Sequence, residues 1–152
     1  MERTTILMVC LGNICRSPLA EGILKDKVDP DKIFVDSAGT GGYHIDEKPD
    51  SRSIEVARNH GIDITNQRCR KFSTSDFEDF DFIYVMDNSN YANVSALANS
   101  ESDIKKIKLL LEVTNNSPQE VPDPYYGGKD GFEKVYQMID KACEVIADNL
   151  NQ

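Results

Sequence analysis

A cysteine and an arginine, separated by five residues, give the strongest chemical signal in the chain. Cys10 ends a run of apolar residues, and Arg16 is followed directly by Ser17, Pro18 and a helical pattern. A short loop between a strand and a helix can turn its main-chain N–H groups inward, and the helix N-terminus adds free donors and partial positive charge. Such a loop binds a tetrahedral anion, and Arg16 can hold two of the anion's oxygens in a bidentate fork.

Cys10 would lie directly beneath an anion held in this way. The N–H dipoles and the Arg16 guanidinium stabilise a thiolate, which is a nucleophile near neutral pH. The Ser17 hydroxyl is close enough in sequence to hydrogen-bond the sulfur. The alternative is an inert cysteine buried at a strand end, which is common for free thiols. The order of glycine, asparagine, arginine, serine and proline after Cys10 favours the nucleophile.

The other loop residues bind the anion or shape the loop in this interpretation. Gly12 and Asn13 are the residue types that most readily adopt the positive φ that a curled loop needs. Ile14 and Cys15 are expected to complete the phosphate-binding segment. Cys15 has two open roles: a small filler of the loop, or a thiol that pairs reversibly with Cys10 under oxidants.

The elements that must position this loop follow from the hydrophobic pattern. Short apolar runs predict strands buried on both faces of a parallel sheet: 6–9, 33–35, 82–86 and 107–111. Helical patterns lie between and after them: 19–28, 51–60, 88–98 and 132–150. Lys108 interrupts the last apolar run, which favours an edge strand. The alternation predicts a doubly wound α/β sandwich, in which ligands bind at the carboxyl ends of the strands.

Size, composition and charge restrict the class of protein. The 152 residues, 39% of them hydrophobic and 28% charged, fit one folded domain over residues 1–152. A formal charge of −9 gives no electrostatic attraction to nucleic acid or to an anionic membrane. An anion must therefore be bound by a small local site. No apolar run is long enough for a membrane span or a signal peptide, so we expect a cytoplasmic protein whose four cysteines are thiols.

The segment VCLGNICRSP at positions 9–18 resembles the signature of the low-molecular-weight protein tyrosine phosphatases. The resemblance covers nearly the whole chain and includes DSAGT at 36–40, Met86-Asp87 and DPYYG at 123–127. It implies a single-domain three-layer sandwich with a four-stranded parallel sheet and helices on both faces, the phosphotyrosine protein phosphatase I-like fold. It also implies hydrolysis of phosphotyrosine and small aryl phosphates through a phosphocysteine intermediate, with no metal and no other cofactor.

Asp123 is the candidate general acid and base. Between Pro122 and Pro124 its backbone has little freedom, and repulsion from a bound dianion would keep its carboxyl protonated, as an acid must be. A simple Asp-Pro turn is the alternative for this spacing. The resemblance favours the acid, since Asp123 matches the family's proton donor.

Aromatic residues offer walls for a flat ring. The resemblance places Tyr125 at the entrance of the pocket, Tyr126 beside it and Tyr43 on the facing side, with Leu11 as an apolar floor. Such a slot favours phosphotyrosine, whose ring holds the phosphate farther from the backbone than phosphoserine does. From the residues alone, Tyr125 and Tyr126 could equally be core aromatics or exposed loop residues.

Asn13 is expected to hold the loop by joining Ser17 to Ser37, rather than to touch the substrate. Many members of the family complete this network with a histidine after the second helix. The aligned residue here is Asn66, which cannot carry a charge. Of the two histidines in the chain, His60 is most simply a residue at a helix C-terminus, and neither belongs to a metal-binding spacing.

Three other functions use all or part of the same loop. An arsenate reductase needs further paired cysteines to relay a disulfide, and Cys69 and Cys143 show no such pairing. Phosphoarginine hydrolysis is typical of relatives with threonine in place of Ile14, so the isoleucine favours phosphotyrosine. An inactive phosphate-binding module or adaptor would show no turnover.

The expected partners follow from the phosphatase interpretation. They are a phosphotyrosine-containing protein as substrate and phosphate or oxyanion inhibitors such as vanadate. Nucleic acid and membrane insertion are not expected. The expected oligomeric state is a monomer or a weak dimer.

Overall fold

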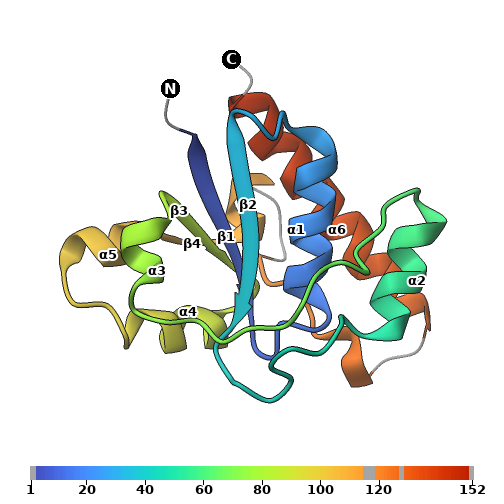
Figure 1. Cartoon of the computed structure of the whole chain (residues 1–152), viewed down its shortest axis with the longest axis horizontal. Coiled ribbons are helices and arrows are strands. Elements are labelled where there is room, and N and C mark those ends of the chain that lie inside the picture. The colour runs from blue at the N-terminus through green and yellow to red at the C-terminus, as the bar shows by residue number, and fades with distance from the viewer. Residues whose placement is uncertain (1–2, 115–118, 127–128, 151–152) are drawn as a thin grey trace.

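The structure is a computed structural model that describes residues 3–114, 119–126 and 129–150, with the backbone alone at Tyr126 and Lys129. Within these residues, four parallel strands form one sheet between two layers of helices (Figure 1). The strands lie in the order β2-β1-β3-β4: β1 is Thr4–Cys10, β2 is Ile33–Gly39, β3 is Phe82–Val85 and β4 is Ile107–Leu109. The fold class predicted from the sequence is confirmed.

Helices from both halves of the chain cover one face of the sheet. They are α1 (Arg16–Lys27) and α6 (Lys129–Leu150), with α2 (Ser51–Asn59) packed beside them (Figure 1). The other face carries the short helix α3 (Asp76–Asp79) and α4 (Asn88–Ser95), and α5 (Glu101–Lys105) leads into β4. Two 3₁₀ turns, Leu110–Thr114 and Pro124–Tyr126, follow β4 and precede α6.

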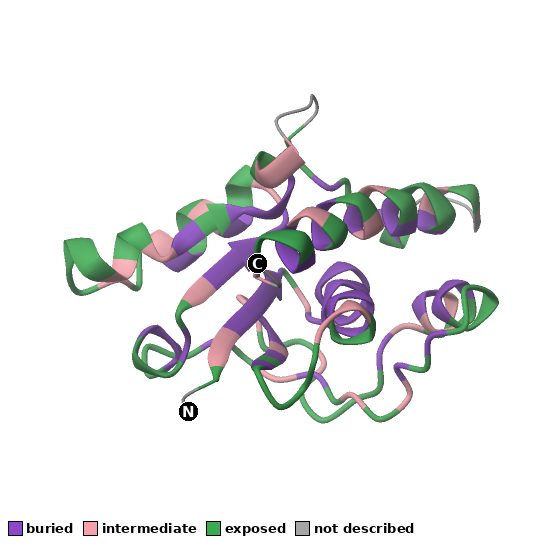
Figure 2. Ribbon diagram, turned by 90° about the horizontal axis from the view of Figure 1, so that it is seen from above, coloured by how far each residue is buried: buried purple, intermediate pink, exposed green. Residues whose placement is uncertain are grey.

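The central strand β1 explains why its apolar run is unbroken. Ile6 and Met8 pack into the core beneath α1 and α6, whereas Leu7 and Val9 pack into the second core beneath α3 and α4. All four side chains are 0% exposed, and buried residues fill the middle of the sheet (Figure 2). A strand covered on both faces needs apolar residues at every position, because successive side chains point to opposite faces.

The edge strands differ from the centre, as Lys108 predicted. Lys108 is exposed on β4, the outermost strand on one side. The expected strand over 107–111 is shorter in the structure, because the chain turns into a 3₁₀ helix at Leu110. The pattern also did not indicate α3 and α5, which have four and five residues and are too short to show a helical repeat.

The candidate loop follows β1, the strand at which the order of the strands in the sheet reverses. The chain leaves β1 for β2 on one side and reaches β3 on the other. Crevices form at the carboxyl ends of the strands beside such a point. Hydrogen bonds join the converging loops there: the Thr40 N–H donates to the Cys10 carbonyl at 2.9 Å, and the Val121 N–H donates to the Met86 carbonyl at 2.8 Å. Among the described residues, no helix has the length and apolar character needed to cross a membrane.

Candidate active site

The loop after β1 and the segment before α6 enclose a cavity of about 360 Å³. Its lining consists of most of the residues that the sequence singled out, joined by one histidine: Cys10, Leu11, Gly12, Ile14, Cys15, Arg16, Tyr43, His44, Asp123 and Tyr125. Asn13, Ser17 and Ser37 lie behind this lining and are buried. The structure therefore brings the predicted nucleophile, anion-binding arginine and acid to one cavity.

Asn13 makes the turn of the loop. Its φ is +58°, in the left-handed region that asparagine tolerates better than most residues, whereas Gly12 does not take a positive φ. The expectation of a positive φ at both residues is thus wrong for Gly12. The curl needs one left-handed residue only, and at position 13 an amide side chain also anchors the loop.

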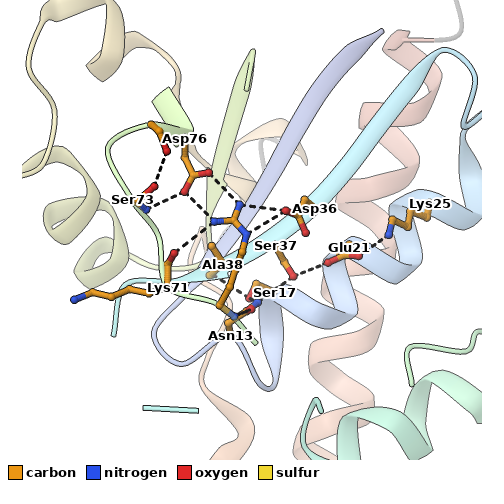
Figure 3. Close-up of polar contacts among 12 residues, drawn as sticks. Asn13, Ser17, Glu21, Lys25, Asp36, Ser37, Ala38, Lys71, Ser73 and Asp76 are labelled. Carbon is orange, nitrogen blue, oxygen red and sulfur yellow. Dashed lines mark hydrogen bonds and ion pairs between the residues drawn. The ribbon is translucent and has the colours of Figure 1, made fainter. Parts of the chain in front are cut away.

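The side chain of Asn13 uses both ends of its amide. Its Nδ2 donates to the Ser17 hydroxyl at 2.8 Å and to the Ser37 hydroxyl at 3.0 Å (Figure 3). Its Oδ1 accepts from the Arg70 main-chain N–H at 2.9 Å. The main-chain carbonyl of Asn13 accepts from the Cys69 thiol at 2.8 Å. The contacts to residues 69 and 70 were not anticipated from the sequence. Asn66, the residue aligned with the family's histidine, is exposed instead.

The Cys10 sulfur lies 3.0 Å from the Ser17 hydroxyl. The cysteine is only 3% exposed, yet its side chain lines the cavity, so an anion in the cavity can reach it while bulk water is largely excluded. Cys15 is the N-cap of α1 and makes no side-chain capping bond. The first N–H groups of α1 thus remain available to an anion.

Arg16 begins α1 and is 3% exposed. Its Nη1 donates to the Asp87 carboxylate at 2.6 Å and to the Val121 carbonyl at 2.9 Å. Burial alone would lower the pKa of Arg16, but attraction to the Cys10 sulfur and to Asp87 outweighs it and raises the pKa. The guanidinium therefore stays charged, and the two acceptors hold it in one orientation.

Asp87 is a functional neighbour that reasoning from the residues did not single out. It follows β3 and caps α4, because its Oδ1 accepts from the Asn90 N–H at 2.8 Å. Its other oxygen holds Arg16. An acidic residue after a strand on the same edge of the sheet is the signal that could have indicated this role.

Asp123 faces the same arginine. Its Oδ1 accepts from the Tyr125 main-chain N–H at 3.0 Å, and its Oδ2 lies 3.8 Å from Arg16 Nη2. One oxygen is thus fixed by the backbone and the other is turned toward the guanidinium. The Asp123 side chain is 35% exposed, so solvent reaches the carboxyl.

Two tyrosines and a histidine stand around the mouth of the cavity. Tyr43 is 71% exposed and Tyr125 is 41% exposed, so they are rim residues rather than core aromatics. Leu11, for which we expected the role of an apolar floor, lines the cavity and is exposed. His44 was missed as a lining residue, and its Nδ1 lies 2.6 Å from the Glu47 carboxylate. Nothing is described for the Tyr126 side chain, so the role predicted for it lies outside the described residues.

Arg52 connects α2 to the segment that carries the acid. Its Nη1 donates to the Tyr125 carbonyl at 3.1 Å, and its guanidinium lies over the Tyr125 ring. It also pairs with Asp50, which caps α2, and lies over the Phe132 ring of α6 at 4.7 Å. Arg52 thus ties the segment of the rim at Tyr125 to α2, and it was not identified from the sequence.

Cys15 is a neutral thiol in this arrangement. Burial, with the nearby Asp50 carboxylate, raises its pKa to about 12. All four cysteines are free. Among the described residues, no three His, Cys, Asp or Glu side chains gather in a way that could hold a metal ion.

The fold and the site together define a class: α/β proteins with a cysteine at the base of a loop that joins a strand to the N-terminus of a helix. Comparisons with known proteins make the class narrower. A family model described as low molecular weight phosphotyrosine protein phosphatase matches residues 5–152. The low molecular weight phosphotyrosine protein phosphatase of Schizosaccharomyces pombe is 41% identical over 141 residues, which cover 89% of this chain and 90% of the relative.

Solved structures agree with this match. The crystal structure of a protein tyrosine phosphatase from Entamoeba histolytica, with Hepes in its active site, has a TM-score of 0.91, 38% identity and 97% coverage of both chains. The structure of a Drosophila arginine phosphatase has a TM-score of 0.89 at 35% identity, covering 97% of this chain and 98% of the other. This chain belongs to the low molecular weight phosphotyrosine protein phosphatase family, a family of hydrolases. The predicted family and enzyme class are confirmed.

Proposed function

We propose that this chain hydrolyses phosphotyrosine and small aryl phosphates through a phosphocysteine intermediate, with residues 1–152 as one phosphatase domain. The observation that supports this most is the shared cavity. It brings Cys10, Arg16 and Asp123 together at the N-terminus of α1. Family membership supplies the reaction class, and the geometry supplies a role for each residue.

In the first step the Cys10 thiolate attacks phosphorus opposite the phenol oxygen. The S–P bond forms as the P–O bond breaks, and Asp123 gives its proton to the departing phenolate. Arg16 and the N–H groups at the start of α1 compensate the charge on the other phosphoryl oxygens. The positive field of these groups is the reason that the proposed chemistry requires no metal.

In the second step water displaces the sulfur. Asp123, now a carboxylate, takes a proton from the attacking water, the P–S bond breaks, and Cys10 returns to the thiolate. Ser17, 3.0 Å from the sulfur, is placed to stabilise that thiolate as it leaves. Release of phosphate restores the starting state.

The rim favours an aromatic leaving group. Tyr43 and Tyr125 line the cavity with Leu11 and Ile14, which leaves an apolar slot above the anion site. Phosphoarginine is the second candidate substrate, because the Drosophila arginine phosphatase is 35% identical and shares the fold. Ile14 in the lining is the observation that favours phosphotyrosine. Matched peptides carrying phosphotyrosine or phosphoarginine at one position separate the two, and a higher kcat/KM for phosphoarginine would overturn the assignment.

Cys10→Ser tests the nucleophile. We expect kcat for p-nitrophenyl phosphate to fall by at least about 10⁴-fold, because loss of a nucleophile removes the covalent route. The variant should still bind vanadate or phosphate and should melt within a few degrees of the wild type. Turnover that survives in the folded variant would rule out the covalent mechanism, and wild-type protein without turnover would favour a binding module.

Asp123→Ala tests the acid. We expect kcat to fall by about 10² to 10⁴-fold for aryl phosphates with poor leaving groups and much less for those with good ones, because only a poor leaving group needs the proton. Asp130→Asn, a carboxyl change nearby in sequence but outside the cavity lining, is the matched control. An equal loss across all leaving groups would remove Asp123 from the acid role.

A further inference from the structure

The guanidinium of Arg52 joins the first turn of α2 to the segment that carries Asp123, and the mechanism above gives it no role. Its Nε and Nη2 each donate to one oxygen of the Asp50 carboxylate at 3.0 Å, and its Nη1 donates to the Tyr125 carbonyl at 3.1 Å. The guanidinium also lies 5.2 Å from the ring centre of Tyr125 and 4.7 Å from that of Phe132. Arg52 is not one of the lining residues of the cavity, so any effect that it has on the reaction passes through another residue.

The first turn of α2 is itself fixed to the loop after β1. The Asp50 main-chain N–H donates to the Ile14 carbonyl at 2.8 Å, and the Ser53 hydroxyl, which is fully buried, donates to the Cys15 carbonyl at 3.3 Å. Asp50 also caps the helix by accepting from the main-chain N–H of Arg52 at 2.8 Å. The side chain of Arg52 therefore projects from a base that keeps its place relative to the loop.

The main chain of Tyr125 connects Arg52 to the acid. Its carbonyl accepts from Arg52, while its N–H donates to Asp123 Oδ1 at 3.0 Å. These groups belong to the 3₁₀ turn Pro124–Tyr126, in which Pro124 is buried. A turn that is packed only at Pro124 can pivot about that residue, and the carboxyl of Asp123 then moves with it. The hydrogen bond from Arg52 to the far side of the turn restricts this movement.

The charge of Arg52 is balanced by its partner. Burial would raise the pKa of Asp50, but hydrogen bonds from Arg52 outweigh it and lower the pKa. Asp50 is therefore ionised at neutral pH, and the pair carries no net charge. Because the two opposite charges lie side by side, they largely cancel at the distance of a bound phosphate. The contacts of Arg52 thus indicate a role in position rather than in attraction of the anion.

We propose that Arg52 is a positioning residue for the acid: it holds the turn that carries Asp123 in place relative to the loop after β1, within the reach that proton transfer requires. The inference rests on the proposed function, since the position of this carboxyl matters only where Asp123 protonates the leaving group. A proton donor must lie within hydrogen-bond distance of the atom that it protonates, and a shift of about 1 Å can cost a factor of about 10² in rate.

Arg52→Met is the sharpest single change. Methionine keeps an apolar stem against the two rings and the main-chain N–H that caps α2, but it cannot donate to the Tyr125 carbonyl. We expect kcat/KM for phenyl phosphate, which has a poor leaving group, to fall about tenfold, a part of the total that a general acid contributes. For 2,4-dinitrophenyl phosphate, whose leaving group needs no proton, kcat/KM should change by less than about twofold.

A double variant separates positioning of the acid from other roles. In an Asp123→Ala background Arg52 has no acid to position, so adding Arg52→Met should cause no further loss with phenyl phosphate. A residue that bound the substrate or only supported the fold would cost the same factor in both backgrounds. Arg58→Met, the same change at an exposed position in the last turn of α2, is the matched control and should keep the wild-type kinetics.

The outcomes distinguish this inference from the proposed function. If Asp123→Ala shows the expected dependence on the leaving group, but Arg52→Met slows both esters equally or slows the Asp123→Ala variant further, the inference fails alone. Wild-type kinetics in folded Arg52→Met also overturn it. If Asp123→Ala shows no such dependence, the acid role and this inference fail together.

Arg52→Gln is the second variant, for use if Arg52→Met does not fold. It keeps a polar side chain but has a single short amide in place of the fork that holds Asp50 and Tyr125 together. The same selective loss with phenyl phosphate is expected, and its absence in the folded variant would overturn the proposal.

Discussion

At the scale of single residues, Asn13 holds the loop after β1 in shape, although it lies behind the cavity lining and not in it. It is 1% exposed, adopts φ +58°, and uses its amide and its carbonyl to bind four other residues. The loop is therefore held open by contacts made before any anion arrives. Preorganised donors stabilise charge without reorganisation at the moment of reaction.

The two contributions of Asn13 can be separated by Asn13→Gly and Asn13→Ala. Both variants lose the side-chain hydrogen bonds, but only alanine is strained at positive φ, by about 1 kcal/mol. We expect both to lower kcat/KM for aryl phosphates about tenfold or more, and Asn13→Ala to be the less stable in urea unfolding. Wild-type activity in Asn13→Gly would show that the loop needs the backbone conformation and not the amide.

At the scale of elements, the end of β2 supports the loop by direct backbone contact. A Cβ placed on Gly39 would lie 2.8 Å from the Leu11 carbonyl oxygen and 2.9 Å from the Asn13 nitrogen. No flexible side chain is available to move aside there. The strand and the loop can approach this closely only because residue 39 lacks a side chain.

Gly39→Ala should therefore displace the loop. We expect a destabilisation of about 1–3 kcal/mol, the usual range for overpacking, together with a marked loss of activity. Gly131→Ala is the matched control: its new Cβ would have only the Pro124 Cβ nearby, at 4.0 Å, and it lies within α6. That variant should keep its activity and gain up to about 1 kcal/mol, because alanine is the better helix former. Equal activity in the two variants would contradict the contact.

The difference between extended sequence patterns and single contacts distant in sequence explains what the sequence could and could not predict. Long or fully buried elements such as β1 and α6 show a pattern over many residues, and the loop motif gave Cys10 and Arg16 directly. The contributions of Asp87 and Arg70 could not be obtained in this way. They act across 71 and 57 residues of sequence, through one carboxylate and one main-chain N–H. The position of Asp87 after a strand is a local signal, but it does not show that the carboxylate binds Arg16, and nothing local marks the Arg70 N–H.

At the scale of the whole molecule, the chain combines a formal charge of −9 with the anion site that we propose. The one buried guanidinium of the site is balanced by Asp87 and faces Asp123. Long-range attraction therefore has little part in binding the substrate. Short-range donors, from Arg16 and the start of α1, must supply the affinity.

Burial of neutral thiols and a phenol also affects the stability of the whole molecule. Burial raises the pKa of Cys69 to about 11, and those of Cys15 and Tyr136 to about 12; it also raises the pKa of Cys143. In the unfolded chain these groups lose their protons at lower pH, near 9 for the thiols and 10 for the phenol. The folded state then binds more protons than the unfolded state, so stability is present below about pH 9 and is lost as the pH rises toward 12.

We therefore expect the melting temperature to change little between pH 7 and 9 and to fall steadily above pH 9, as followed by circular dichroism. Tyr136→Phe removes one of the titrating groups while keeping the ring that stacks on His60 at 4.0 Å. Its melting temperature should fall less steeply than that of the wild type between pH 10 and 11, because one fewer buried proton favours the folded state there. Tyr43→Phe, at a 71% exposed position, is the matched control and should parallel the wild type. A Tyr136→Phe curve that also parallels the wild type would mean that the phenol of Tyr136 does not couple folding to alkaline pH.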